Sequence, residues 1–274
     1  MNLQNKITIV AMSDTGMVRR KNEDALGYDS TLGLAVLADG MGGHRGGEVA
    51  SSMTVDTVID LLQQQLPNVK PGQTDSKSGY SLESICIQEA IESANDLVFQ
   101  AADANPKHSG MGTTVVVLQF YNNAFSLLHI GDSRCYRLRN DSFEQITKDH
   151  SLLQELIDRG FYTREEARTS LNKNLVTRAL GIDPLVTADI QEDIVLKNDI
   201  YLLCSDGLTD YVEDEYIYLT IKRFSDNLEE AAKQLINKAN QNGGKDNISV
   251  MLCRIDDDFS IEQSWLNKLV ARFE

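Results

Sequence analysis

The sequence predicts an α+β fold built on antiparallel β-sheets, and three observations support this. Runs rich in β-branched and aromatic residues, separated by turn residues, recur along most of the chain and are typical of strands. Three long segments instead carry apolar residues at helical spacing. These helical segments are grouped apart from the strands and do not alternate with them. Such grouping is typical of a layered α+β domain and not of an alternating βαβ fold.

Three long helices are expected. Residues 46–66 and 81–104 carry apolar residues along one side, and a polar segment rich in Pro, Gly and Ser (67–80) separates the two as a loop. The third helix spans 228–242 and ends at Gly243 and Gly244, which suit a helix C-cap.

The strands are expected between and after these helices. A hairpin turn at residues 121–123 (YNN) joins two of them. Residues 150–171 are polar and read as short helical pieces on the surface. The expected strands are residues 32–38, 113–120, 125–130, 136–138, 200–204 and 248–255.

Composition narrows the class of protein. The 274 residues include 41 acidic and 26 basic ones, for a formal net charge of −15, which argues against nucleic acid or an anionic membrane as a partner. No apolar run approaches the ~18 residues that span a bilayer, and the first residues do not resemble a signal peptide, so a cytoplasmic location is expected. The four cysteines are widely spaced, which favours buried free thiols over a zinc site or disulfides.

Aspartates recur where the predicted strands end. Asp39, Asp132 and Asp206 each follow an apolar run, and Asp246 directly precedes one. In antiparallel neighbours the end of one strand lies beside the start of the next, so these four residues can gather at one sheet edge. The sequence Asn-Glu-Asp at 22–24 could supply two more acids.

Two explanations of this pattern remain open. Asp-Gly and Asp-Ser are common turn pairs, so each aspartate could serve only its own turn. If the four carboxylates converge, however, they repel one another strongly unless divalent cations neutralise them. Oxygen ligands without His or Cys select Mg²⁺, Mn²⁺ or Ca²⁺ over zinc, and no EF-hand loop is present. The glycine-rich stretch after Asp39 would let a backbone carbonyl approach such a cation.

Six segments in order resemble the metal-dependent protein phosphatases of type 2C, particularly the compact bacterial members. The resemblance implies a four-layer αββα sandwich with two antiparallel β-sheets between pairs of helices. It implies a catalytic domain over 1–255 with a flap subdomain at about 148–181 beside the cleft. The six segments are SDTGMVRRKNEDA, VLADGMGGHRGGEVAS, GMGTTVV, HIGDSRCYR, SDGLTD and GGKDNISV.

The resemblance also implies a set of metal ligands for Mn²⁺ or Mg²⁺. Asp39 would bridge two ions, and the carbonyl of Gly40 and the carboxylate of Glu23 would belong to the second. Asp206 and Asp246 would hold the first ion. Asp132, together with Asp206, matches a weaker third position in bacterial relatives.

The implied activity is hydrolysis of phosphoserine and phosphothreonine by a metal-bridging hydroxide, with no side-chain nucleophile. Arg19 matches the arginine that grips the substrate phosphate. One position departs from vertebrate-type members, which carry a proposed leaving-group acid where this chain has Met41. His44 could donate that proton or orient substrate, or it could only fix the glycine loop by hydrogen bonding.

Residues 256–274 lie outside these segments and carry an apolar stripe at helical spacing, which predicts an amphipathic helix that packs on the domain or docks another protein. The expected partners are phosphoprotein substrates and a cognate Ser/Thr kinase, and the chain is expected to be a monomer. Two other functions stay open: a relative that binds metal or phosphoprotein without turnover, and a hydrolase of small phosphoesters. Because both Asp39 and Arg19 are present, the active phosphatase is favoured.

Overall fold

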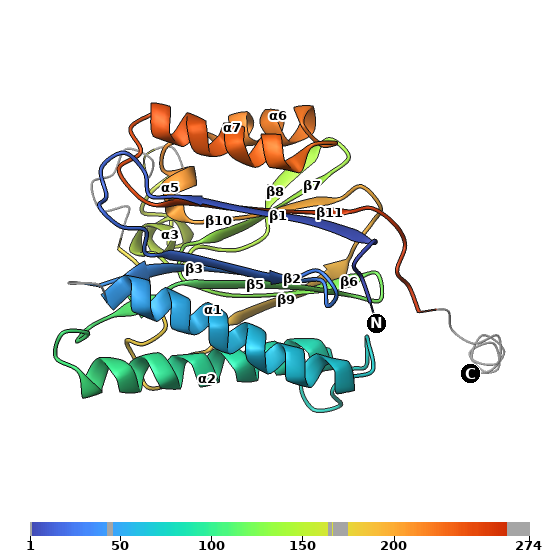
Figure 1. Ribbon diagram of the computed structural model, residues 1–274, viewed down its shortest axis with the longest axis horizontal. Coiled ribbons are helices and arrows are strands. Elements are labelled where there is room, and N and C mark those ends of the chain that lie inside the picture. Colours follow the sequence, from blue (N-terminus) through green and yellow to red (C-terminus); the bar gives the residue numbers. More distant parts are fainter. Residues whose placement is uncertain (1, 43–45, 164–165, 167–174, 262–274) are drawn as a thin grey trace.

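The structure is a computed structural model that describes residues 2–42, 46–163, 166 and 175–261. Two β-sheets lie face to face, with α6 and α7 covering one outer face and α1 and α2 the other (Figure 1). The described strand pairs are all antiparallel. The predicted α+β class and the four-layer sandwich are therefore confirmed.

The first sheet has the order β1-β11-β10-β7-β8, so the first and last strands of the chain pair near its edge. Two helices cover it, and the short helix α5 follows β10 directly. The bounds are β1 (Ile7–Asp14), β7 (Arg134–Arg139), β8 (Ser142–Gln145), β10 (Ile200–Cys204), β11 (Ile248–Ile255), α5 (Asp206–Thr209), α6 (Asp214–Arg223) and α7 (Leu228–Gln241).

The second sheet has the order β2-β3-β5-β6-β9, with the short strand β4 paired to β3. The long helices α1 and α2 pack on its outer face (Figure 1). The bounds are β2 (Asp24–Asp29), β3 (Leu34–Met41), β4 (Gly112–Thr113), β5 (Val115–Tyr121), β6 (Ala124–Ile130), β9 (Asp189–Ile194), α1 (Gly46–Gln65), α2 (Leu82–Ala104), the 3-10 helix η1 (Leu66–Asn68) and α3 (Leu152–Asp158).

Period-two alternation explains why the strands are apolar on both faces. Leu34, Val36 and Ala38 of β3 pack against α1 and α2. Ala35 and Leu37, the residues between them, pack against the other sheet. Strands β10 and β11 divide their residues between α7 and the inter-sheet core in the same way. The central strands of each sheet are therefore buried on both faces, whereas the edge strands β8 and β9 are partly exposed.

Several sequence predictions on local structure are confirmed. The β5–β6 hairpin turns at Asn122 and Asn123, both with positive φ. The helix expected over 81–104 is α2, which Ser81 caps by accepting a hydrogen bond from the Ser84 N–H at 3.1 Å. All four cysteines are free thiols, and three of them are buried. The amphipathic helix expected within 256–274 falls largely on residues 262–274, outside the described residues.

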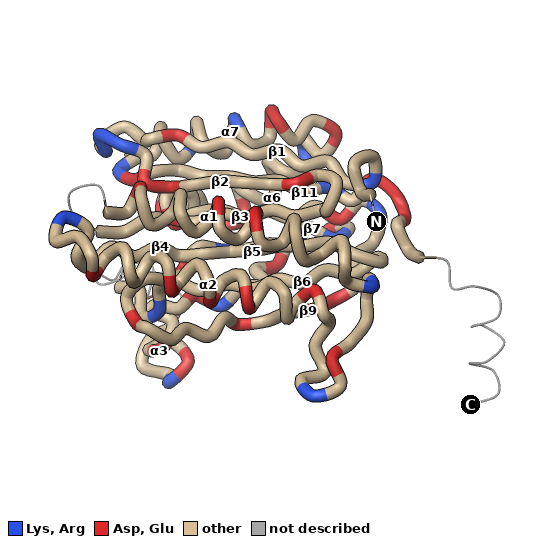
Figure 2. The backbone as a smooth tube through the Cα atoms, turned by 60° about the horizontal axis from the view of Figure 1, so that its bottom comes forward, with Lys and Arg blue, Asp and Glu red and all other residues tan. Residues whose placement is uncertain are grey.

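Charge is unevenly distributed over the fold (Figure 2). Helices α1 and α2 carry several acidic residues and no lysine or arginine, so that outer layer offers no basic footprint for nucleic acid. Among the described residues, no helix is both long and apolar enough to cross a membrane.

Candidate metal centre

The ends of β3 and β10 lie at the same edge of the two sheets, beside α5 (Figure 1), and the acidic residues at these ends interact electrostatically. Asp39 lies near the end of β3, and Asp24 at the start of β2 is its direct partner in the antiparallel pair. From the other sheet, Asp206 begins α5 after β10, and Asp246 lies two residues before β11. The predicted gathering of strand ends and strand starts is thus found in the structure.

The alternation in β3 sets the direction of the Asp39 side chain. Asp39 shares a strand face with Ala35 and Leu37, which pack toward the other sheet, so its carboxylate lies between the two sheets. The Ser205 hydroxyl, at the end of β10, crosses this space and donates to Asp24 Oδ2 at 2.9 Å. The two sheets are therefore joined by hydrogen bonds at the acidic edge.

A threonine connects Asp39 to the turn that carries Asp132. The Thr114 hydroxyl accepts the Asp39 N–H at 3.0 Å, and the Thr114 N–H donates to the Asp39 carbonyl at 2.9 Å. The same hydroxyl lies 2.7 Å from the Ser133 hydroxyl, one residue after Asp132. Thr114 thus holds the β3 end and the turn after β6 in a fixed relation.

The carboxylates of this edge perturb one another. Burial, followed by the charges of Asp24 and Asp206, holds the pKa of Asp39 well above its usual range. Burial and the charge of Asp132 do the same to the pKa of Asp206. Burial, with the charge of Asp149, raises the pKa of Asp132 to about 6. Without a counter-ion these acids cannot all be charged at neutral pH without a large repulsive cost.

The donor set fits a hard divalent cation. Carboxylate oxygens are the ligands that Mg²⁺ and Mn²⁺ take in proteins. Asp24 Oδ1 is buried without a hydrogen-bond partner, so an acceptor at this edge is still unsatisfied. Within the described residues, no lysine or arginine forms an ion pair with Asp39, Asp132 or Asp206. A bound cation would supply the missing positive charge.

Arg19 and Glu23 lie beside the acidic edge, and both are at least partly exposed to solvent. An Arg19 guanidinium nitrogen is 2.8 Å from Asp246 Oδ2, and about half of the Arg19 side chain is exposed. Burial and the charge of Asp246 raise the pKa of Glu23, while the charge of Arg19 lowers it. The guanidinium therefore faces the acids with donors left for an anion from solvent.

The glycines after Asp39 allow two backbones to touch. A Cβ at Gly40 would overlap the Gly47 carbonyl in the first turn of α1, and a Cβ at Gly47 would lie 2.7 Å from the Gly40 carbonyl oxygen. The Gly40 N–H donates to the Glu23 carbonyl at 3.1 Å, and Ser51 of α1 donates to the same oxygen at 2.5 Å. The start of α1 thereby fixes both Gly40 and Glu23.

Asn247 is a positioning residue that the sequence analysis missed. Its side-chain carbonyl accepts the Glu23 N–H at 2.8 Å, and its amide donates to the Thr15 and Lys21 carbonyls. It follows Asp246 directly, so one residue joins an acid of the first sheet to the loop that carries Arg19. The sequence signal for this role is an asparagine, Asn247, directly before the apolar run of a predicted strand.

The structure describes Met41, which occupies the place of the vertebrate-type acid, but it does not describe His44, the candidate proton donor. Met41 ends β3 and pairs with Gly112 of β4. His44 lies outside the described residues, so its two interpretations stay predictions.

A second cluster of titratable side chains lies near the acidic edge, and the sequence analysis did not predict it. His129, His150 and Asp189 bring donor atoms within 4.8 Å of one another. His129 and His150 are buried, and Asp189 begins β9. His129 lies in the segment HIGDSR, three residues before Asp132, and His150 lies in the polar segment KDHS.

Comparison with known proteins gives consistent results. The family model for Protein phosphatase 2C matches residues 10–248. The serine/threonine protein phosphatase PstP of Mycobacterium tuberculosis is 37% identical over 257 residues, covering 92% of this chain and 46% of the relative. This chain therefore spans about half the length of that relative.

Two further matches cover both partners almost completely. The serine/threonine phosphatase stp of Listeria innocua is 35% identical over 243 residues, covering 88% of this chain and 92% of the relative. The crystal structure of the PstP catalytic domain in complex with two manganese ions superposes with a TM-score of 0.79 at 35% identity, covering 92% of this chain and 99% of that one.

Proposed function

This chain belongs to the protein phosphatase 2C family of serine/threonine protein phosphatases, and from that premise we propose that it hydrolyses phosphoserine and phosphothreonine in proteins with two divalent cations. The observation that carries the proposal is the edge of partly buried, mutually repelling carboxylates, where Asp39 and Asp206 have no basic partner among the described residues. The PstP catalytic domain holds two manganese ions, which favours manganese over magnesium here.

Within this proposal the acids divide into two groups. Asp39 would serve both ions, because it lies between the two sheets with Asp206 and Asp24 beside it. Asp206 and Asp246 would hold one ion, and Glu23 and the Gly40 carbonyl the other. When bound, the two cations supply an activated water nucleophile and stabilise charge on the phosphoryl group.

Arg19 would bind the substrate phosphate. Its guanidinium is already desolvated in part and oriented by Asp246, so a phosphate can take over its remaining donors with little loss of side-chain entropy. The loop that carries it is fixed through Asn247, which would keep Arg19 close to the acids that hold the cations. No described cysteine or serine is needed as a nucleophile.

The decisive test is hydrolysis with excess Mn²⁺ of two substrates, p-nitrophenyl phosphate and a phosphothreonine peptide. We expect turnover of both, abolished by a chelator and restored by Mn²⁺. Binding of the peptide without turnover would support the non-enzymatic alternative. Turnover of p-nitrophenyl phosphate alone would support the small-phosphoester alternative, and no reaction with either would refute the enzymatic proposal.

We propose a separate, weaker cation position at Asp132, which approaches Asp206 from the turn after β6. Asp132→Asn should slow turnover while the two-cation core stays occupied. Calorimetric titration with Mn²⁺ measures this, and loss of every binding event in that variant would contradict a separate position.

Two broader elements of the proposal concern partners. Residues 148–181 would act as a flap that selects protein substrates, since His150 bonds to Gly131, next to Asp132, and Thr177 bonds to His150. A cognate Ser/Thr kinase would supply the phosphoproteins. A phosphoproteome of a strain lacking this gene would identify the substrates, and an unchanged phosphoproteome would contradict this role.

A further inference from the structure

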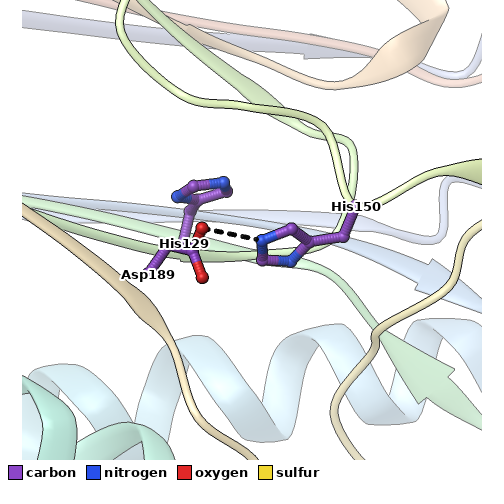
Figure 3. Close-up of side chains that lie close together, drawn as sticks. All are labelled: His129, His150 and Asp189. Carbon is purple, nitrogen blue, oxygen red and sulfur yellow. Dashed lines mark ion pairs between the residues drawn. The ribbon is translucent and has the colours of Figure 1, made fainter. Parts of the chain in front are cut away.

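His129, His150 and Asp189 come from three separate segments and meet beside the turn that carries Asp132. Figure 3 shows the His150 ring directed at the Asp189 carboxylate, with the His129 ring close by. His129 lies in β6, His150 precedes α3, and Asp189 begins β9. Two histidines and a carboxylate are also a common set of transition-metal ligands, so this possibility comes first.

The ring geometry argues against a shared metal ion. An imidazole binds a metal in its own ring plane, along the lone pair of one nitrogen. The two rings are stacked, with centroids 4.7 Å apart and planes only 22° from parallel, so their planes do not meet near the nitrogens. Asp189 is also engaged, because its Oδ1 accepts from Arg178 at 2.8 Å.

The protonation of His150 argues the same way. The Gly131 N–H donates to His150 Nδ1 at 3.1 Å, so Nδ1 is an acceptor and the ring proton of neutral His150 is on Nε2. Nε2 faces Asp189 Oδ2 at 3.4 Å. A nitrogen that carries a proton has no lone pair for a metal. Burial, with the charge of His129, lowers the pKa of His150 to about 4, which keeps the ring neutral near pH 7.

The contacts of His150 instead describe a clamp on the turn before Asp132. The His150 N–H donates to the Gly131 carbonyl at 2.9 Å, so backbone and ring together hold both polar groups of Gly131. Gly131 has a φ of +110°, a left-handed conformation that turns the chain between His129 and Asp132. Its other side rests on the Thr114 side chain. The direction of Asp132 therefore depends on what holds Gly131.

His150 also lies where the two ends of the 148–181 segment meet. The Thr177 N–H donates to the His150 carbonyl at 2.8 Å, and the Leu152 N–H donates to the Leu175 carbonyl at 2.9 Å. Arg178, next to Thr177, reaches the ring through Asp189. His129 closes the arrangement, because it stacks on His150 while its Nε2 lies 2.9 Å from the Lys148 carbonyl oxygen.

We propose that His150 is a positioning residue that sets the cation affinity of Asp132 by holding Gly131 through its Nδ1, while Asp189, itself paired with Arg178, faces the far side of its ring. The proposal rests on the cation position at Asp132 proposed above, and it names the contact by which the 148–181 segment acts on that position.

Two substitutions separate this role from simple packing. In His150→Asn the side-chain carbonyl oxygen lies as many bonds from the backbone as Nδ1, so it can still accept the Gly131 N–H. In His150→Gln the amide reaches toward Asp189 and leaves Gly131 without its acceptor. Mn²⁺ titration by calorimetry should show the weakest binding event reduced roughly tenfold in the Gln variant and within about twofold of wild type in the Asn variant. The tighter events should be unchanged in both.

Asp189→Asn is the matched control, since it keeps an acceptor for the ring and leaves the Gly131 contact intact. It should stay within about twofold of wild type. Equal losses in the Asn and Gln variants would overturn the proposal, because both variants remove the same ring. Thermal unfolding without metal verifies that each variant is folded.

A measurement on the unmodified chain keeps the proposal testable if the variants do not fold. Nitrogen-15 NMR of the metal-free protein should show His150 protonated on Nε2. An Nδ1-protonated ring, or a Zn²⁺-induced shift of both histidines that is lost in His129→Ala, would refute the clamp in favour of a metal site. Neither readout needs turnover, so failure of the clamp is distinguishable from failure of the phosphatase proposal.

Discussion

Two sets of wholly or partly buried aspartates in this protein differ in one respect. Asp199 is 2% exposed and is held by Arg139 through two guanidinium nitrogens, at 3.0 and 2.7 Å. Asp149 is paired with Arg134 in the same way. Asp39 and Asp206 are held in the same fold without any such partner among the described residues, and their pKa values are raised. The fold can neutralise a buried carboxylate, so the places where it does not do so mark where a cation is required.

The strongest test of this comparison removes one unpaired acid. Asp39→Asn should reduce kcat by at least about a hundredfold, because the charge proposed to bridge both cations would be lost. It should also raise the thermal unfolding midpoint of the metal-free chain, since one source of repulsion disappears. Steady-state kinetics and calorimetry with Mn²⁺ measure both effects. Near-normal turnover would contradict the bridging role.

The converse test removes a partner from a paired acid. Arg139→Ala leaves Asp199 buried and charged, so we expect a loss of about 3 kcal/mol in the free energy of unfolding. Urea titration measures this, with turnover per folded molecule unchanged because Arg139 lies away from the acidic edge. If stability were unaffected, the contrast between paired and unpaired acids would have no energetic basis.

A third test concerns the arginine that the acidic edge does engage. Arg19→Ala should lower kcat/KM for a phosphothreonine peptide roughly thirtyfold, as expected for lost hydrogen bonds between charged groups. Arg19→Lys should recover only part of this, because an ammonium lacks the planar fork. Mn²⁺ affinity should change little in either variant. Equal kinetics for the Ala variant and wild type would remove Arg19 from phosphate binding.

The smallest expected effect is a pH dependence of the metal-free protein. The pKa of Asp132 is raised to about 6, so the stability it contributes is present below its unfolded pKa of about 4 and is lost as pH rises through 6. His129 and His150 have lowered pKa values and the opposite slope. We therefore compare wild type with Asp132→Asn, which keeps both histidines. The variant's advantage in unfolding midpoint should grow by about 3 °C between pH 5 and pH 7, and a constant difference would contradict the raised pKa.

Sequence patterns predicted the strands and helices whose apolar residues form continuous runs or follow a regular period. Strands such as β3 and β10 were visible because they are apolar on both faces, and their terminal aspartates followed from antiparallel geometry. Strand β2 was missed because DALGYD at an edge of its sheet has no apolar run. Helix α6 was also missed, since only three of its ten residues are buried.

The supporting residues of the site could not be found in this way. Asn247 acts through an amide that bridges three backbone groups from residues 15 to 23, and no local pattern encodes such contacts. His150 was assigned to a surface segment because its neighbours are polar, yet the ring is buried against a turn 19 residues earlier. That contact depends on the φ of Gly131, which the sequence alone does not specify.

Gly40 and Gly47, whose backbones touch, limit which substitutions this chain can accept near Asp39. With no room for even one methyl group between strand and helix, β3 and α1 have to shift together or not at all. Alanine at either position would force the start of α1 away from the end of β3. Glu23, whose carbonyl is bonded to Ser51 of α1, would then move away from Asp39. The relative positions of Glu23 and Asp39 thus depend on the absence of a side chain at Gly40 and at Gly47.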